Sequence, residues 1–199
     1  MRVVIASKNQ GKIDEIESIM AMTGIEFLSF DDFENWPEVA ETGATFKENA
    51  LLKARAISGF ARLPALADDS GLEVDVLGGE PGVLSSRYAG PHSSTPENNA
   101  KLLRKLGHTA FEERAARFRC VAAFASSDGS VLLAEGTCEG HITLEPRGAA
   151  GFGYDPLFMP EGYDRTIAEL SPEEKNLISH RGKAFRMLKE KLETLLQKA

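Results

Sequence analysis

The sequence is poor in cysteine, contains no long apolar run and has no excess of basic residues. Its 199 residues include only two cysteines, Cys120 and Cys138, which are too few for a disulfide framework. No apolar stretch approaches the roughly 20 residues that a membrane-spanning helix needs. The formal net charge of -7 argues against a basic surface for DNA or RNA. We therefore expect a cytoplasmic protein with reduced cysteines that contacts neither membrane nor nucleic acid.

The composition that remains is that of an ordinary soluble globule, with 42% hydrophobic and 27% charged residues. We expect residues 1–199 to form one domain with a substantial core, because no linker, repeat or low-complexity tract divides them. Segments of β-rich composition alternate with segments of helical spacing. The clearest are a strand at 2–6, helices at 11–22 and 45–60, and a hairpin around Asp128-Gly129. This mixture predicts an α/β fold with a mixed sheet.

Two adjacent carboxylates, Asp68 and Asp69, follow the apolar run from Leu63 to Ala67 and precede Ser70-Gly71. An apolar run that ends in acids is typical of a buried strand with charge at its carboxyl end, where α/β sheets bind ligands. Two part-buried carboxylates repel each other unless a cation lies with them, and a hard divalent cation prefers oxygen ligands. The pair therefore predicts a Mg²⁺ site, with a solvated turn as the alternative.

Glu41 and Lys53 lie on either side of a capping box formed by Thr45 and Glu48. The helix that this box begins comes directly before the strand with the two acids. Glu41 and Lys53 can therefore face Asp68 and Asp69, although a lysine on a helix is more often a solvated surface residue.

The segment Ser7-Lys8-Asn9-Gln10-Gly11-Lys12 lies between the first predicted strand and the first predicted helix. The start of a helix after a glycine-bearing turn binds anions through backbone N–H groups and the helix dipole. Lys12 in the first turn opposes that dipole, which is understandable if an anion lies between them. A P-loop is rejected because Ala6 and Ile13 replace the glycine and the hydroxyl residue that it needs. The alternative is an ordinary helix start with a surface lysine.

Two glycines surround an aromatic residue in Gly151-Phe152-Gly153-Tyr154-Asp155. Glycines let the backbone approach a flat ligand closely, and an aromatic ring can stack on a base. The alternative is a turn that closes the edge of a sheet.

Lys175, His180 and Arg181 supply several hydrogen-bond donors near the end of the chain. On one unbroken helix, His180 and Arg181 would point about 140° and 240° away from Lys175, so the three could not converge. Ser179 can cap a new helix that begins near His180. We therefore predict a short helix after Ser171-Pro172, a break near residues 177–179 and a long final helix, against the alternative of one continuous basic-faced helix.

Taken together, these segments resemble the inosine triphosphate pyrophosphatase family. The matching pieces occur in family order over nearly the whole chain: Ser7-x-Asn9-x-Gly11-Lys12, Glu41-Thr42-Gly43-x-Thr45-Phe46-x-Glu48-Asn49-Ala50, Ala67-Asp68-Asp69-Ser70-Gly71-Leu72, Leu77-Gly78-Gly79-x-Pro81-Gly82, Ser86-Arg87-Tyr88-Ala89-Gly90, Phe152-Gly153-Tyr154-Asp155-Pro156 and Glu174-Lys175-Asn176-x-Ile178-Ser179-His180-Arg181. Each piece is weak alone, but the ordered set is specific. One departure is Ala40, where many bacterial relatives carry a second Glu before the Glu41 position.

The resemblance implies an elongated mixed β-sheet with flanking helices, two lobes around a central cleft, and a homodimer. It implies Mg²⁺-dependent hydrolysis of ITP, dITP and XTP to nucleoside monophosphate and pyrophosphate. Asp69 would be the catalytic carboxylate and a Mg²⁺ ligand, and Glu41 a second acidic ligand. The implied substrate contacts are Ser7, Lys8, Asn9, Gln10, Gly11, Lys12, Lys53, Ser70, Phe152, Gly153, Tyr154, Asp155, Lys175, His180 and Arg181.

The donors at the base end favour a purine with a 6-keto acceptor over adenine, whose 6-amino group is itself a donor. This accounts for rejection of ATP but not of GTP, which also carries a 6-keto group. Two alternatives stay open from the sequence. One is a nucleotide pyrophosphatase of different base preference, and the other is a nucleotide sensor without turnover.

Overall fold

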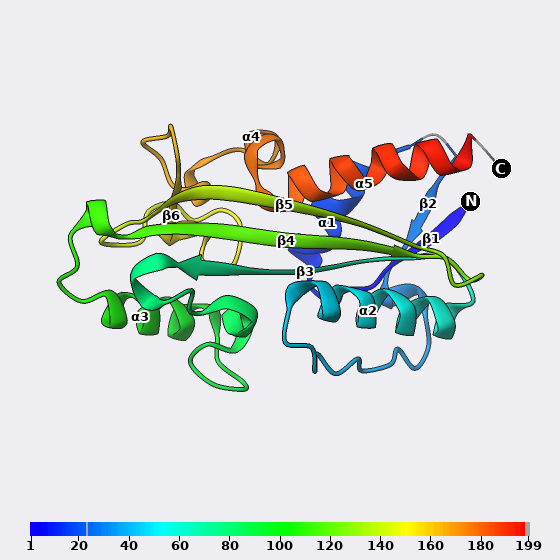
Figure 1. Ribbon diagram of the computed structural model, residues 1–199, viewed down its shortest axis with the longest axis horizontal. Helices are drawn as coiled ribbons and strands as arrows, with labels where there is room; N and C mark the ends of the chain where they lie inside the picture. The colour runs from blue at the N-terminus through cyan, green and yellow to red at the C-terminus, as the bar shows by residue number, and fades with distance from the viewer. Residues whose placement is uncertain (23, 198–199) are drawn as a thin grey trace. The chain divides into compact units, whose positions relative to one another are not determined.

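The computed structural model describes residues 1–22 and 24–197, and in these residues six strands form one mixed sheet (Figure 1). The sheet order is β2-β1-β3-β4-β5-β6. The strands are β1 (Arg2–Ile5), β2 (Glu26–Leu28), β3 (Ala65–Val74), β4 (Ala115–Ala125), β5 (Val131–Ile142) and β6 (Phe158–Pro160). β1 is parallel to both β2 and β3, whereas β5 and β6 are antiparallel. The predicted α/β fold with a mixed sheet is confirmed.

The helices begin where local capping signals stand in the sequence. They are α1 (Gln10–Met20), α2 (Phe46–Ala61), α3 (Thr95–Leu106), α4 (Pro172–Ile178) and α5 (His180–Leu196). The side chains of Asn9, Thr45 and Ser171 accept the backbone N–H three residues on, at the starts of α1, α2 and α4. Ser179 has extended backbone angles and separates α4 from α5, so the predicted helix break is confirmed. None of the described helices is long and apolar enough to cross a membrane.

The chain divides into two compact units. The first unit comprises the residues up to Asp69, Cys120–Gly136 and the chain from His180 onward. The second unit comprises Ser70–Arg119 and Thr137–Ser179. Two of the four boundaries between the units, at Asp69/Ser70 and Ser179/His180, fall within segments that the sequence marked as functional.

The first unit has helices on both faces of its strands (Figure 1). On one face, α1 and α5 pack their buried side chains, among them Ile16 and Phe185, against strand residues that include Leu66. On the other face lies α2, which buries Ala54 and Ile57. The residues of β3 alternate between these two faces, because successive side chains of a strand point to opposite sides.

The second unit has its own core, built around the parts of β3, β4 and β5 that belong to this unit. Leu102 and Leu106 of α3 join Leu72 of β3 in this core. The rings of Phe118 and Phe158 also meet there, with centroids 4.6 Å apart.

The predicted end of the third strand at Ala67 is wrong, because β3 continues through both acids to Val74. Leu72 and Val74 are fully buried and extend the apolar pattern beyond the charges. Asp68 and Asp69 therefore lie in the middle of a strand rather than at its carboxyl end. A strand can carry buried acids at such a place only where each acid has a partner.

Candidate active site

Asp68 points to the face of β3 that α1 and α5 cover. Its carboxylate is 3.0 Å from Nζ of Lys12 on α1 and 3.0 Å from Nη2 of Arg181 on α5. The Asp68 side chain is 1% exposed and the Arg181 side chain 2% exposed, so this is a desolvated ion pair. Such a pair is stable only when its charges are well matched.

Glu15 completes this group from the next turn of α1. Its carboxylate accepts a hydrogen bond of 2.7 Å from Nη1 of Arg181. Burial opposes the charge of Arg181, but the attraction of Asp68 and Glu15 raises its pKa above the ordinary value. Sequence reasoning missed Glu15. The signal that could have found it is its position three residues after Lys12, which places both on one side of α1.

Asp69 points to the opposite face of β3, toward α2. Its Oδ1 atom is 2.9 Å from Nζ of Lys53, and the same ammonium group is 2.7 Å from Oε1 of Glu41. Nδ2 of Asn49 donates to Oδ2 of Asp69 at 3.3 Å. The structure thus brings Glu41 and Lys53 together with Asp69, as predicted. The prediction that they also face Asp68 is wrong, because Asp68 points to the opposite face of β3.

The electrostatics of this group suit a proton acceptor. Burial raises the pKa of Asp69, and the attraction of Lys53 offsets this only in part. Burial opposes the charge of Lys53, but Asp69, Asp68 and Glu41 together raise its pKa. Lys53 therefore stays charged, and Asp69 is a stronger base than an ordinary aspartate.

Asn49 ties the loop before α2 to Asp69. Its Oδ1 atom accepts the N–H of Gly43 at 2.8 Å, and the side chain is fully buried. Gly43 lies so close that a Cβ there would be 2.6 Å from Cβ of Glu48 and 2.7 Å from Oδ1 of Asn49. Sequence reasoning gave Asn49 no role. A polar residue on the buried stripe of α2 is the signal that could have shown one.

The donor set of Glu41 and Asp69 fits a hard cation such as Mg²⁺. Both carboxylates lie within hydrogen-bond distance of one ammonium group, so together they already accommodate a positive charge. Within the described part of the chain, no group of three or more His, Cys, Asp or Glu residues is arranged to hold a metal. Two carboxylates completed by water and phosphate oxygens are a usual environment for Mg²⁺.

The predicted phosphate segment, residues 7–12, connects β1 to α1. Asn9 caps α1 with its side chain, and Ser7 accepts the N–H of Asn9 at 3.1 Å. Lys8, Asn9 and Gln10 are exposed. Lys12 pairs with Asp68, so the charge that the sequence linked to an anion also has a protein partner.

In the second unit, the predicted base-binding residues form a compact group around Asp155. Its Oδ2 atom accepts the N–H of Phe152 at 2.9 Å and pairs with Nζ of Lys175 at 2.5 Å. The same Nζ atom lies 4.5 Å from the centre of the Phe152 ring, as a cation–π contact. Gly151 is required beside them, because its φ is 74° and a Cβ there would be 2.2 Å from Oδ2 of Asp155.

The remaining predicted residues are divided between the two units. Ser70 follows Asp69 in β3 and begins the second unit, which also contains Gly153, Tyr154 and Lys175. His180 and Arg181 begin α5 in the first unit and are both buried. A direct contact of these residues with a base stays a prediction.

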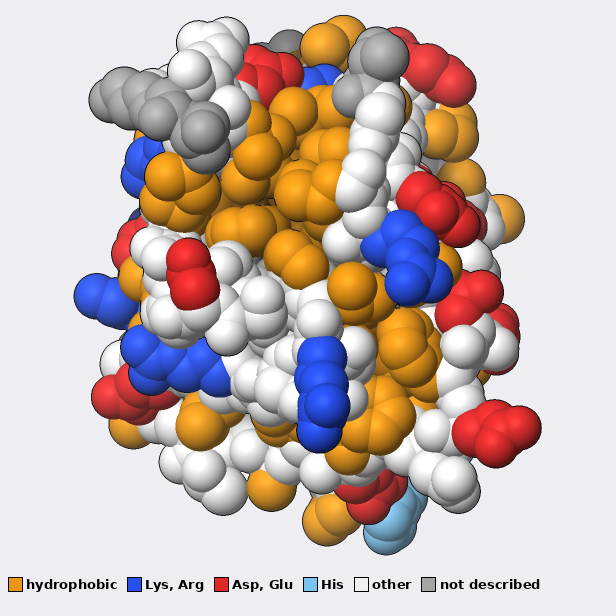
Figure 2. Space-filling model, turned by 90° about the vertical axis from the view of Figure 1, so that its right-hand side faces the viewer, with side chains coloured by type: hydrophobic (Ala, Val, Ile, Leu, Met, Phe, Trp, Pro, Cys, Tyr) orange, Lys and Arg blue, Asp and Glu red, His pale blue; other side chains and the backbone are white. Residues whose placement is uncertain are grey.

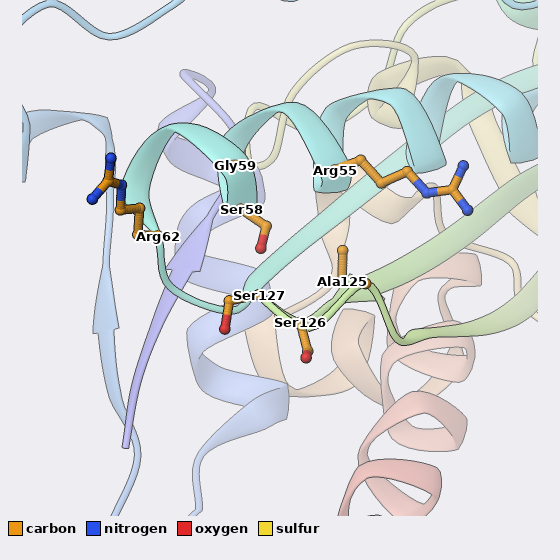
Figure 3. A pocket seen from close by; sticks show the side chains of 8 residues that line it. Arg55, Ser58, Gly59, Arg62, Ala125, Ser126 and Ser127 are labelled. Carbon is orange, nitrogen blue, oxygen red and sulfur yellow. The ribbon is translucent and has the colours of Figure 1, made fainter.

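A pocket of about 510 Å³ lies elsewhere in the first unit, between the end of α2 and the turn that joins β4 to β5. Figure 3 shows Ser58 pointing toward this turn, while Arg55 and Arg62 extend away to either side. The lining residues are Arg55, Ser58, Gly59, Arg62, Ala125, Ser126, Ser127 and Gly129. None of these is a predicted nucleotide contact, so the pocket is separate from the candidate site.

Comparison with known proteins places this geometry in a family. The sequence model of the Ham1 family matches residues 3–191. The dITP/XTP pyrophosphatase of Geobacillus kaustophilus is 50% identical over 194 residues, which cover 98% of this chain and 95% of the relative. The dITP/XTP pyrophosphatase of Streptomyces coelicolor is 50% identical over 189 residues, which cover 94% of each protein.

Solved structures agree with the sequence relatives. The Ham1 protein of Staphylococcus aureus is similar with a TM-score of 0.86 at 42% identity, over 98% of this chain and 99% of that one. The HAM1 protein of Coxiella burnetii is similar with a TM-score of 0.86 at 43% identity, over 100% of both chains. The resemblance drawn from the ordered motifs is thereby confirmed, and the chain belongs to the Ham1 family.

Proposed function

We propose that this protein hydrolyses the non-standard purine nucleoside triphosphates ITP, dITP and XTP to nucleoside monophosphate and pyrophosphate. The observation that carries the proposal is the convergence of Glu41 and Asp69 on the ammonium group of Lys53. This group lies in a chain half identical, over nearly its whole length, to enzymes named dITP/XTP pyrophosphatases. The hydrolysis removes these nucleotides from the pool.

The residues of the first unit suit attack of water at the α-phosphorus. A bond forms from the water oxygen to the α-phosphorus, and the bond from that phosphorus to the bridging oxygen breaks, which releases pyrophosphate. Asp69, with its raised pKa, accepts the proton of the water. Lys12, Lys53 and the residue 7–12 segment bind the phosphates, because this chemistry depends mostly on positioning and charge neutralisation.

Mg²⁺ belongs to the proposal as the cofactor that Glu41 and Asp69 would hold. When bound, it supplies neutralisation of the negative charge on the phosphates. Asn49 keeps Asp69 in place from the buried side, and its bond to Gly43 holds the loop that carries Glu41.

The residues of the second unit suit recognition of the base. The ring of Phe152 offers a stacking surface, and the ammonium group of Lys175 is a donor for the 6-keto oxygen of hypoxanthine or xanthine. Adenine presents a donor at the same position, and two facing donors leave buried groups unpaired. For His180 and Arg181, which belong to the first unit, donation to the base stays a prediction from the family resemblance.

A homodimer in the cytoplasm is also part of the proposal. Figure 2 shows apolar side chains gathered on one face of the molecule. The exposed apolar side chains of the first unit include Met1, Leu52, Phe60, Leu195 and Leu196. Burying such a surface against a second copy is favourable. Sedimentation equilibrium tests the dimer, and a monomer at all concentrations would contradict it.

The proposed location in the cytoplasm rests on the cysteines. The buried free thiols of Cys120 and Cys138 suit a reducing compartment.

The test of the activity is a substrate panel with product identification. The purified protein is incubated with ITP, XTP, GTP, ATP and dTTP, with Mg²⁺ and then with EDTA. We expect monophosphate and pyrophosphate from ITP and XTP, with Mg²⁺ only, and little product from ATP. Orthophosphate and diphosphate would place the attack at the γ-phosphorus and overturn the mechanism. Binding of ITP without turnover would establish a sensor instead.

A further inference from the structure

The loop Gly151–Asp155, here called the platform loop, is held from three other elements of the second unit. Tyr154 donates its hydroxyl to the carbonyl of Ser85 at 2.9 Å, and Lys175 of α4 pairs with Asp155. The third hold comes from α3, where Nδ2 of Asn99 donates to the carbonyl of Gly153 at 3.1 Å. Asn99 lies 54 residues from Gly153 in sequence, so no local pattern indicates this bond.

The backbone at Gly153 is the part of the platform loop that has the most conformational freedom, so a hydrogen bond to its carbonyl matters most there. Gly153 has φ of 61°, and a Cβ built there would meet nothing within 4 Å. A glycine in open space rotates its peptide groups more freely than any other residue. Phe152 comes directly before Gly153 and Asp155 lies two residues after it, so a rotation at Gly153 would move both the ring and the carboxylate.

Asn99 is an unfavourable residue for the stability of the folded state. The residue is only 9% exposed, and within the described residues its Oδ1 atom is buried without a hydrogen-bond partner. A buried acceptor without a partner destabilises the folded state, and an apolar side chain at this position would not have that cost. Stability alone therefore does not explain an asparagine here. The bond to Gly153 fixes the amide orientation, because only Nδ2 can donate to a carbonyl.

We propose that Asn99 is a positioning residue for base recognition: its amide fixes the Gly153 peptide, and thereby the placement of Phe152 and Asp155 against a purine base. The inference rests on the proposed function. It adds a specificity-supporting residue on α3, outside the motifs that mark the base-binding segment. Asn99 acts through the platform loop, not through its own contact with substrate.

Asn98 provides a matched control on the same helix. It is also an asparagine and is 5% exposed. Its Oδ1 atom accepts the N–H of Ala89, and its Nδ2 atom donates to the carbonyl of Ser86. It therefore holds a different loop, and its loss measures the general cost of removing a buried asparagine from α3.

The test compares Asn99→Ala with Asn98→Ala by calorimetric binding of inosine monophosphate and of pyrophosphate to each intact protein. We expect Asn99→Ala to weaken inosine monophosphate about fivefold, the effect of one neutral hydrogen bond, and to leave pyrophosphate affinity unchanged. Asn98→Ala should change neither. Equal weakening of both ligands by Asn99→Ala, or the same loss in Asn98→Ala, would overturn the inference.

Hydrogen exchange gives a readout that does not depend on substrate. Amides of residues 152–155 should exchange faster in Asn99→Ala than in the unaltered protein, whereas Asn98→Ala should not change their exchange. Unchanged exchange in Asn99→Ala would show that Asn99 does not hold the platform loop. Asn99→Asp, of nearly the same size but without the donor, should reproduce the result if the alanine variant folds poorly. Turnover of ITP by the unaltered protein tests the proposed function separately.

Discussion

Asp68 and Asp69 are neighbours in the chain, yet their carboxylates lie on opposite faces of β3 and bind different cations. Asp68 binds Lys12 and Arg181, whereas Asp69 binds Lys53. The strand geometry separates the two charges, so they do not share a single cation as the sequence suggested. Each acid thus has its own environment. Asp69 lies with Glu41 in a group suited to catalysis, and Asp68 lies in a desolvated ion-pair group.

Replacement of Asp69 should remove turnover while leaving the substrate bound. In Asp69→Asn, the side chain can no longer accept a proton, so kcat for ITP should fall by a factor of about 10² to 10⁴. Binding of ITP should survive, since Lys12, Lys53 and the platform loop are unchanged. Steady-state kinetics with circular dichroism as a folding control checks this, and an unaltered kcat would refute the catalytic assignment.

The titration of Asp69 should differ from that of an ordinary aspartate. In the metal-free protein, burial should raise its pKa above 3.8, so the carboxyl takes up its proton at a higher pH. Lys53→Met should raise the pKa further, because the attraction of Lys53 is the largest opposing influence. Mg²⁺ should lower it if the cation binds Asp69. Carboxyl ¹³C NMR titration measures all three, and a pKa at or below 3.8 would contradict the first expectation.

Gly43 should tolerate no side chain. In Gly43→Ala, the new Cβ meets Cβ of Glu48 and Oδ1 of Asn49 at 2.6 and 2.7 Å, so the loop that carries Glu41 must move. We expect kcat/KM to fall about tenfold or more, because small misplacements near reacting groups are costly. Gly59→Ala is the control, since nothing lies within 4 Å of its Cβ. This control should keep full activity and gain about 0.5–1 kcal/mol in α2. Equal kinetics in both variants would show that the Gly43 loop is not held tightly.

Replacement of Arg62 by glycine should stabilise the protein. It follows α2 in the left-handed conformation with φ of 53°, which costs an ordinary residue about 1 kcal/mol or more. Arg62→Gly should therefore raise the free energy of unfolding by up to about 1 kcal/mol. Arg55→Gly, inside α2, should lower it by about the same amount. Urea unfolding measures both, and a loss of stability in Arg62→Gly would mean that its side chain matters more than its backbone.

Arg181 should be the most sensitive residue of the ion-pair group. Arg181→Met removes the guanidinium group that pairs with both Asp68 and Glu15, so the free energy of unfolding should fall by about 3–5 kcal/mol. Lys12→Met should cost less, because the side chain of Lys12 is 19% exposed and water screens its charge. Denaturant unfolding of the two variants decides the order, and equal losses would contradict it.

Features that depend on neighbouring residues were readable from the sequence. The capping boxes at Thr45 and Ser171, the hairpin turn and the break at Ser179 are all present. Each is decided within a few residues, because a cap satisfies backbone groups only three positions away. The ordered motifs also sufficed to recognise the family.

The tertiary structure decided which charges meet. Asp68 and Arg181 are 113 residues apart, and nothing local to either one specifies the other as its partner. The same holds for Glu15, Asn49 and Asn99, whose roles depend on contacts made by distant segments. The sequence predicted one metal site for the two acids, because adjacency in the chain does not show to which face of the strand each side chain points. Only the pleat of β3, continued by buried residues beyond them, sends Asp68 toward α5 and Asp69 toward α2.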